Sequence, residues 1–168
     1  MNPFTPYIET LQSAHMEDEF QKYQQAFRDH QRIIILGNGG SSSVASHISQ
    51  DYMKFEGKKV SILSDPSMIT MLSNDFGYEN AYQKFLEYYV EDNTLVVIIS
   101  SSGESTNMIN CMNHCEEHGI SYGVLTGFHP HNTLRRNAQY SKWNYHVDSE
   151  SYGVVECVHQ IFLHRSES

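Results

Sequence analysis

Side chains of the types that bind divalent cations lie in two segments of this sequence that show a helical pattern. His47 and Asp51 are four residues apart, so on a helix they share one face and can hold a single ion. In the last helical segment, Glu156, His159 and His164 offer further ligands. Eight residues span about 12 Å of helix, which still lets Glu156 and His164 converge. Two imidazoles with two carboxylates suit Zn²⁺, although a histidine four residues from an aspartate is also common as an ordinary surface pair.

A glycine-rich turn at residues 37–43 can bring the backbone close to a ligand. Its sequence, Gly-Asn-Gly-Gly-Ser-Ser-Ser, follows a short β-branched run and leads into a helical pattern. Free N–H groups and three hydroxyls therefore gather at a helix start. The spacing matches neither the dinucleotide fingerprint nor the nucleoside-triphosphate loop. A ligand contact and a purely structural turn both stay open for this segment, because glycine commonly serves the turn itself.

A second polar turn, at residues 100–106, is unusually rich in hydroxyl groups. It reads Ser-Ser-Ser-Gly-Glu-Ser-Thr and lies between the strongest apolar run and a helical pattern. Four serines and a threonine at a helix start can surround a phosphate with neutral donors, adding to the positive end of the helix dipole. The alternative is a serine N-cap with chance neighbours, but capping alone needs only one such residue. We interpret this turn as a phosphate or phosphosugar site.

The elements that must position these groups alternate between strands and helices. Residues 95–99 form a nonalternating apolar run, typical of a parallel strand covered on both faces. Further strands are expected at residues 33–36, 60–63, 122–125 and 143–147. Apolar residues at helical spacing mark residues 7–27, 44–52, 66–72, 78–89, 108–118 and 153–164. This order predicts a three-layer α/β fold with an open parallel sheet.

Two side-chain stripes on these helices are interpreted as packing surfaces. The first is aromatic and is expected in the core or between subunits, because aromatic stripes bury a large area; it comprises Tyr78, Tyr82, Phe85 and Tyr89. The second contains Cys111 and Cys115, which are four residues apart and are expected to be buried thiols.

Composition and charge narrow the class of protein. The 168 residues suffice for one domain with one core. Twenty acidic residues against 11 basic ones give a formal charge of -9, and the basic residues form no patch, so nucleic acid is not expected as a partner. The apolar runs are too short to span a membrane, and residues 1–18 lack a secretory signal, which predicts a cytoplasmic protein.

Three motifs together resemble the sugar isomerase (SIS) family of phosphosugar-binding domains. They are the GNGGS turn, the SSSGES turn and the sequence SNDFGY at residues 73–78, which narrows the resemblance to the phosphoheptose isomerase branch. The similarity runs over residues 33–164. It implies a flavodoxin-like αβα sandwich with a five-stranded parallel sheet. The expected organisation is a single SIS domain over residues 1–168, with an N-terminal helix at about 5–30 and a core at about 32–164.

The resemblance also implies where the substrate binds. Serines of both turns are expected to hold the phosphate, with Asn38 and Asp75 near the sugar. The residues expected to bind substrate are Asn38, Gly39, Gly40, Ser41, Asp75, Ser100, Ser101, Ser102, Ser105 and Glu156. Active sites are expected at the subunit interfaces of a homotetramer.

The metal site implied by the resemblance holds one Zn²⁺ per subunit on His47, Asp51, Glu156 and His164. The family has histidine, glutamate, glutamine and histidine at these positions, so two of the four ligands differ in type. Asp51 and His164 are also the expected catalytic residues. The shorter Asp51 replaces a glutamate that serves as base, and Glu156 adds a negative charge that neutralises part of the cation.

The function implied is metal-dependent aldose-ketose isomerisation of a phosphorylated sugar. The expected reaction converts sedoheptulose 7-phosphate to D-glycero-D-manno-heptose 7-phosphate. Two alternatives stay open: a noncatalytic protein that binds phosphosugars or a partner, and an isomerase for a different phosphosugar. Loss of the metal ligands would favour the noncatalytic alternative, whereas this sequence keeps four potential ligands.

Overall fold

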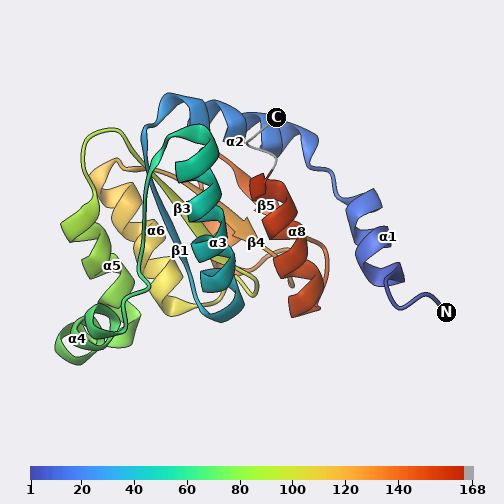
Figure 1. Cartoon of the computed structure of the whole chain (residues 1–168). Coiled ribbons are helices and arrows are strands. Elements are labelled where there is room, and N and C mark those ends of the chain that lie inside the picture. Colours follow the sequence, from blue (N-terminus) through green and yellow to red (C-terminus); the bar gives the residue numbers. More distant parts are fainter. Residues whose placement is uncertain (165–168) are drawn as a thin grey trace.

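The computed structural model describes residues 1–164, which contain one sheet of parallel strands between two layers of helices (Figure 1). The strand order is β2-β1-β3-β4-β5, and every neighbouring pair is parallel. The strands are β1 (Arg32–Gly37), β2 (Lys59–Ile62), β3 (Thr94–Ser100), β4 (Ser121–Thr126) and β5 (Asn144–His146). The predicted three-layer fold and its five-stranded parallel sheet are confirmed.

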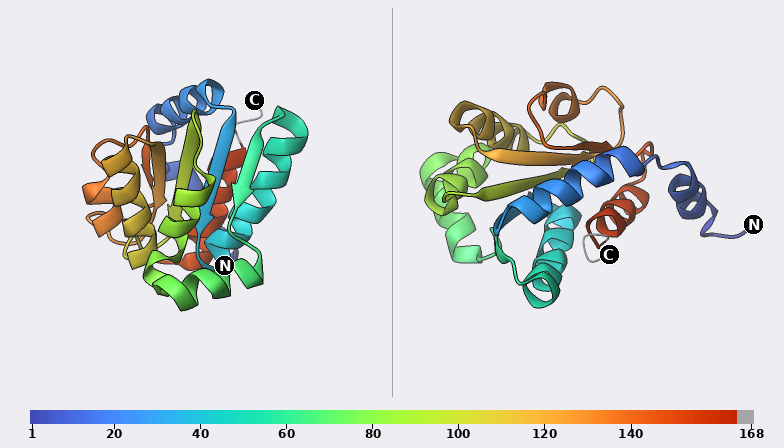
Figure 2. Two further views of the ribbon diagram at one scale, coloured as in Figure 1. Left: turned by 90° about the vertical axis from the view of Figure 1, so that its left-hand side faces the viewer. Right: turned by 90° about the horizontal axis from the view of Figure 1, so that it is seen from above.

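Helices cover both faces of the sheet, as two further views show (Figure 2). In β1, Ile33 and Ile35 pack in a core with α2, α3 and α8, whereas Ile34 and Leu36 pack in a second core with α4 to α7. The helices are α1 (Thr5–Ser13), α2 (Glu17–Asp29), α3 (Gly39–Glu56), α4 (Pro66–Phe76), α5 (Tyr78–Tyr89), α6 (Thr106–His118), α7 (Thr133–Asn137) and α8 (Tyr152–His164). Within residues 1–164, no helix has the length and apolar character that a membrane crossing requires.

The order of the strands reverses between β1 and β3. The chain leaves β1 through α3 to reach β2 on one side, and β3 then pairs with β1 on the other side. Because α3 and α6 pack in different cores, the helices that leave β1 and β3 lie on opposite faces. In open α/β sheets such a reversal opens a crevice beyond the carboxyl ends of the strands, where ligands bind. Both polar turns, residues 37–43 and 100–106, lie at this point.

The N-terminal segment differs from the single helix expected over residues 7–27. It forms two helices, α1 and α2, and the backbone is extended at Ala14 between them. The apolar spacing already changes there, because Leu11 and Met16 are five residues apart. Both helices contact the same core, but α2 contributes fully buried residues to it, whereas Tyr7 and Leu11 of α1 are only partly buried against it.

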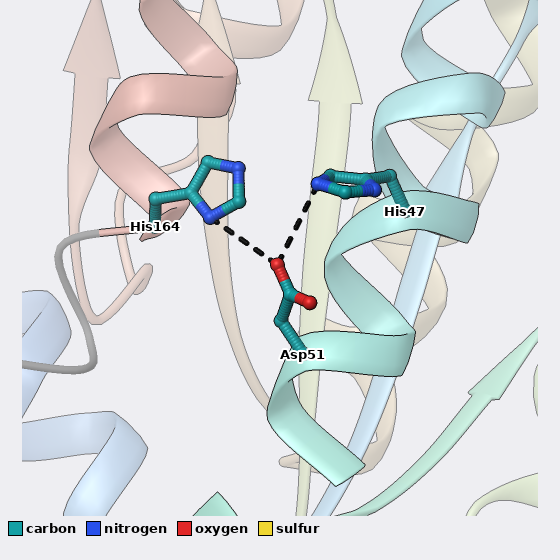
Figure 3. A group of neighbouring side chains, drawn as sticks. All are labelled: His47, Asp51 and His164. Carbon is teal, nitrogen blue, oxygen red and sulfur yellow. Dashed lines mark ion pairs between the residues drawn. The ribbon is translucent and has the colours of Figure 1, made fainter. Parts of the chain in front are cut away.

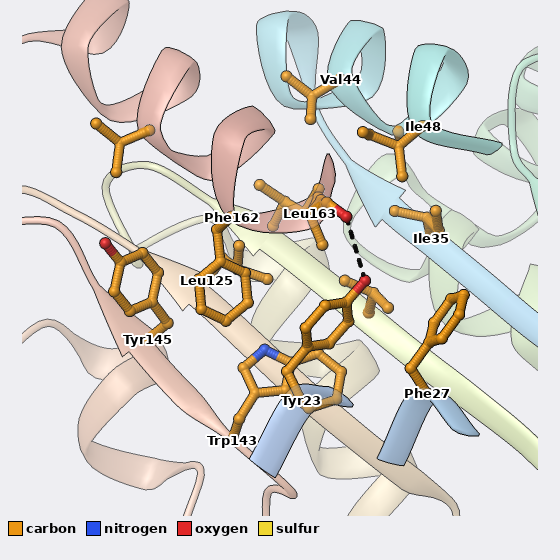
Figure 4. Packing of buried hydrophobic residues seen from close by; sticks show 14 of the residues in the cluster. Tyr23, Phe27, Ile35, Val44, Ile48, Leu125, Trp143, Tyr145, Phe162 and Leu163 are labelled. Atoms are coloured by element: carbon orange, nitrogen blue, oxygen red, sulfur yellow. Dashed lines mark hydrogen bonds between the residues drawn. The ribbon is translucent and has the colours of Figure 1, made fainter. Parts of the chain in front are cut away.

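The core between α2, α3 and α8 is built around aromatic rings (Figure 4). Tyr23, Trp143 and Phe162 lie in contact, with ring centroids 5.0 Å apart for Tyr23 and Trp143 and 5.2 Å apart for Tyr23 and Phe162. Tyr52 of α3 donates a hydrogen bond to the carbonyl oxygen of Leu163 in α8 at 3.0 Å, and its hydroxyl also meets that of Tyr23. These contacts fix α3 against α8.

Of the two stripes predicted to pack, the cysteine pair is buried and the aromatic stripe is buried at two of its four positions. Cys111 and Cys115 are fully buried free thiols, and burial raises the pKa of Cys115 to about 12. In the aromatic stripe, Tyr82 and Phe85 lie in the core, whereas Tyr78 and Tyr89 are 50% and 40% exposed. The hydroxyl groups of Tyr78 and Tyr82 also reach the first polar turn.

Candidate active site

A cavity of about 350 Å³ opens at the point where the strand order reverses. All residues expected to bind substrate line it except Asp75. The lining comprises Asn38, Gly39, Gly40, Ser41, Ile99, Ser100, Ser101, Ser102, Ser105, Tyr152 and Glu156. The two polar turns, which are about 60 residues apart in the sequence, thus form one site.

Neutral hydrogen-bonding groups dominate this lining. Asn38 and Ser105 are the N-cap residues of α3 and α6, and neither makes a side-chain cap hydrogen bond. The positive ends of both helix dipoles therefore lie at the cavity without a local cap. The hydroxyl of Ser101 is buried and has no partner within residues 1–164. An anion such as phosphate suits this combination of groups.

The second turn holds its own serine side chains in place. The N–H of Gly103 donates to Ser100 Oγ at 3.2 Å, and Ser100 Oγ lies 3.5 Å from Ser105 Oγ. The N–H of Glu104 donates to Ser102 Oγ at 3.2 Å. Because the turn itself orients these hydroxyls, a bound anion has less side-chain entropy to remove.

Glu156 brings the cavity its single charged side chain among the lining residues. A Cβ atom added to Gly40 would lie 2.3 Å from Glu156 Oε1 and 2.4 Å from Oε2. A larger residue at position 40 would therefore displace the carboxylate from the start of α3. The carboxylate accepts hydrogen bonds and opposes a second negative charge.

Asp75, which is expected near the sugar, is not among the residues that line the cavity of a single chain. It is exposed in the last turn of α4, where its carboxylate accepts a hydrogen bond from Asn74 Nδ2 at 2.9 Å. Gly77, with φ of 81°, then redirects the chain into α5. Within one chain, the SNDFGY motif therefore reaches the cavity region through Tyr78 rather than through Asp75.

A second group of candidate site residues lies farther along α3 and α8 (Figure 3). Asp51 Oδ2 is 3.5 Å from His47 Nε2 and 3.4 Å from His164 Nδ1. One potential ligand atom from each residue lies within 4.8 Å of the other two. Two imidazoles and one carboxylate form the kind of three-ligand set that leaves further coordination positions of a zinc ion open. The donor types and their convergence therefore fit the metal expected from the sequence.

Three of the four expected metal ligands come together, and Glu156 lies outside their group. The reason is the length of the helix between them, because the eight residues from Glu156 to His164 rise about 12 Å. Glu156 lies level with Gly40 at the start of α3, whereas His164 lies level with Asp51. The carboxylate of Glu156 thus belongs to the cavity and not to the group of His47, Asp51 and His164.

Buried contacts hold this three-residue group in register. Tyr52 and Leu163, which are joined by a hydrogen bond of 3.0 Å, are the sequence neighbours of Asp51 and His164. Any slip of α8 along α3 would break that bond, so Tyr52 fixes the level at which Asp51 and His164 meet. His47 remains accessible, with half of its side chain exposed.

Sequence reasoning missed several residues of this region. Tyr152 and Ile99 line the cavity, and Asn107 pairs with Asn38. Tyr152 begins α8 one residue before the expected start, so only the helix boundary could have drawn attention to it. Asn107 stands in the first turn of α6, where a polar residue is ordinary.

Comparison with known proteins assigns the family. The family model of the SIS domain matches residues 4–127. The chain belongs to the SIS domain family. Among solved structures, a phosphoheptose isomerase from Neisseria gonorrhoeae superposes on this SIS domain with a TM-score of 0.89 at 20% identity, over 97% of this chain and 92% of that chain. A phosphoheptose isomerase from Francisella tularensis gives 0.80 at 19% identity, over 95% and 86%. At such identities the likeness establishes the fold.

Curated relatives of this SIS domain carry the same name. The phosphoheptose isomerase of Aneurinibacillus thermoaerophilus is 30% identical over 118 residues, which cover 67% of this chain and 60% of the relative. That of Fusobacterium nucleatum is 32% identical over 111 residues, covering 62% of this chain and 57% of the relative. The matched segment therefore spans about three fifths of the length of these relatives.

Proposed function

We propose that this SIS domain protein is a metal-dependent aldose-ketose isomerase that acts on a phosphorylated sugar. The observation that carries the proposal is a cavity suited to an anion, lined in part by α3 and α8, together with a His-Asp-His group farther along the same two helices. His47 follows Gly40 by seven residues, which places the group about 10 Å along α3 from the cavity. An extended sugar phosphate can place its phosphate in the cavity and its carbonyl near the group.

The substrate proposed is sedoheptulose 7-phosphate, with D-glycero-D-manno-heptose 7-phosphate as the product. The separation along the helix suits a long sugar whose phosphate and reactive carbons are at opposite ends. The names of the relatives give the same substrate class. Binding of the phosphate by the serine hydroxyls of both turns would supply the energy that orients the distant carbons.

The proposed chemistry is proton transfer between adjacent carbons of the sugar. His47, Asp51 and His164 would hold one Zn²⁺ per subunit, and a bound divalent ion supplies polarisation of the substrate carbonyl. A carboxylate oxygen of Asp51 takes the proton from C1 of the ketose, while His164 supplies a proton to the oxygen on C2. Return of a proton to C2 and loss of the proton from the oxygen on C1 give the aldose. Atoms balance, and no external oxidant is needed.

Assembly and location extend the proposal. Copies of this chain are proposed to form a homotetramer with sites at the subunit interfaces, in the cytoplasm. The exposure of His47, and the position of Asp75 outside the cavity of a single chain, are compatible with a second subunit completing the site.

The test is turnover of sedoheptulose 7-phosphate with and without a chelator, compared with other ketose phosphates. Asp51→Asn and His164→Gln are expected to lose at least 100-fold in kcat, whereas Asp92→Asn and His118→Gln, at the opposite end of the sheet, keep it. Full turnover by the first two variants would contradict the assignment. Binding of sugar phosphates without turnover by the wild type would favour the noncatalytic alternative. Turnover of another ketose phosphate alone would correct the substrate.

A further inference from the structure

Two side-chain amides tie the polar turns together across the strand reversal. Asn38 Nδ2 donates to Asn107 Oδ1 at 2.9 Å, and Asn107 Nδ2 donates to Asn38 Oδ1, also at 2.9 Å. Asn107 is only 3% exposed. Asn38 occupies the N-cap position of α3 but makes no cap hydrogen bond there. An asparagine that would ordinarily cap its own helix instead binds the first turn of α6.

Two tyrosines of α5 support the same turn. Tyr78 Oη donates to Asn38 Oδ1 at 2.7 Å, and Tyr82 Oη donates to the carbonyl oxygen of Gly37 at 3.1 Å. Burial raises the pKa of Tyr82, so its hydroxyl keeps the proton that it donates. With hydrogen bonds from Tyr78 and Asn107, Asn38 Oδ1 has both of its acceptor positions in use. The orientation of the Asn38 amide is therefore set by the protein.

The side-chain hydrogen bonds between the two turns lie beyond the end of the backbone pairing between β1 and β3. Beyond the carboxyl ends of β1 and β3 the strand pairing has ended, and α3 and α6 diverge to opposite faces of the sheet. The distance between residues 37–43 and 100–106 then depends on contacts between the turns themselves. The amide pair is a direct, partly buried contact of this kind, and both turns line the cavity.

We propose that Asn107 is a positioning residue of the phosphate site. Assisted by Tyr78, Asn107 sets the spacing of the two turns for a tetrahedral anion. The inference rests on the proposed function in one respect, namely that the cavity binds the phosphate of the substrate. Asn107 acts through Asn38 and is assigned no contact with the ligand. Its removal changes the affinity for phosphate more than the rate of the proton transfer about 10 Å away.

The test compares Asn107→Ala with Asn110→Ala on the same helix. Asn110 is a matched control because it is an asparagine of the same helix whose amide also makes tertiary hydrogen bonds, but these go to α5, to the carbonyl oxygen of Glu79 at 2.9 Å and to Asn80 Oδ1 at 3.2 Å, and to neither polar turn. Calorimetric titration with inorganic phosphate is expected to give about tenfold weaker binding for Asn107→Ala and less than twofold change for Asn110→Ala. With sedoheptulose 7-phosphate, KM is expected to rise about tenfold while kcat changes less than threefold.

Tyr78→Phe provides a second variant that removes one hydroxyl from a half-exposed ring, so it keeps the proposal testable if Asn107→Ala fails to fold. We expect about threefold weaker phosphate binding. In the double variant the effects are expected to be less than additive, because both residues act through the amide of Asn38. Additive effects would show that Tyr78 acts independently and would overturn its assistance to Asn107.

The possible failures can be told apart. If the wild type binds phosphate and Asn107→Ala binds it equally well, the positioning role is wrong and the proposed function stands. If both alanine variants weaken binding equally, the role is also wrong, because general loosening of α6 then explains the loss. If the wild type binds no phosphate at all, the proposed function fails and the positioning role fails with it.

Discussion

Replacement of Gly103 by alanine tests the geometry of the serine turn most sharply. Gly103 has φ of +68°, and a Cβ atom added there would lie 1.9 Å from Asn132 Oδ1 and 2.1 Å from its Cγ. Asn132 is only 1% exposed and cannot simply turn into solvent. Its Oδ1 accepts the N–H of Arg135 at 2.9 Å, and its Nδ2 donates to the carbonyl oxygen of Gly127 at 3.2 Å.

Two contributions to the free energy of unfolding follow from these contacts. The left-handed backbone costs an alanine about 1 kcal/mol. Displacement of Asn132 disrupts those two hydrogen bonds and a third, from Nδ2 to the carbonyl oxygen of His129 at 3.0 Å. At about 1 kcal/mol for each buried bond, the displacement adds about 3 kcal/mol. Gly103→Ala is therefore expected to lower the free energy of unfolding by about 4 kcal/mol.

Gly119→Ala supplies the matched control at the other end of α6. Gly119 has φ of +65°, and nothing lies within 4 Å of an added Cβ, so only the backbone contribution of about 1 kcal/mol applies. Urea unfolding followed by circular dichroism measures both variants. Equal losses in the two variants would refute the packing of the second turn against Asn132.

Three further perturbations address the site and its surroundings. Glu156→Gln removes the charge from the cavity and should tighten phosphate binding about fivefold in calorimetry; unchanged or weaker binding would contradict this. Tyr52→Phe removes the hydrogen bond to Leu163 and should weaken zinc binding about tenfold in a competition assay. Unchanged affinity would show that this bond does not position Asp51 and His164 for the metal. Burial lowers the pKa of His159 from 6.5 to about 4; the unfolded chain therefore binds the extra proton between these values, and the free energy of unfolding should fall by about 3 kcal/mol as the pH drops from 6.5 to 4. His159→Gln should lessen that fall in urea unfolding, and an unaltered pH dependence would refute the role of His159.

Much of the fold could be predicted because the signals were local. The apolar run at residues 95–99 predicted the central strand. The glycine and serine turns after two strands predicted the position of the cavity, because ligands of open α/β sheets bind beyond the carboxyl ends of the strands. Asp51 and His47 followed from helical spacing alone. The break between α1 and α2 was not predicted, because no proline or glycine marks it and the sign in the sequence is a single five-residue gap between Leu11 and Met16.

The features of the site that could not be predicted from the sequence depend on tertiary contacts. The level of α8 along α3, fixed through Tyr52 and Leu163, decides that His164 joins Asp51 while Glu156 remains at the cavity. Likewise, nothing in the local sequence around Asn107 indicates a partner 69 residues away. Such pairs become visible only when the order of the strands is known.

One sugar phosphate is proposed to span the cavity and the His-Asp-His group and to be isomerised there. The most direct measurement is proton NMR of sedoheptulose 7-phosphate incubated in D₂O with the zinc-loaded protein. We expect the signals of an aldose 7-phosphate with deuterium at C2, and we expect them to be absent when Asp51→Asn is used. A spectrum identical to that of the sugar without protein would show that no isomerisation takes place.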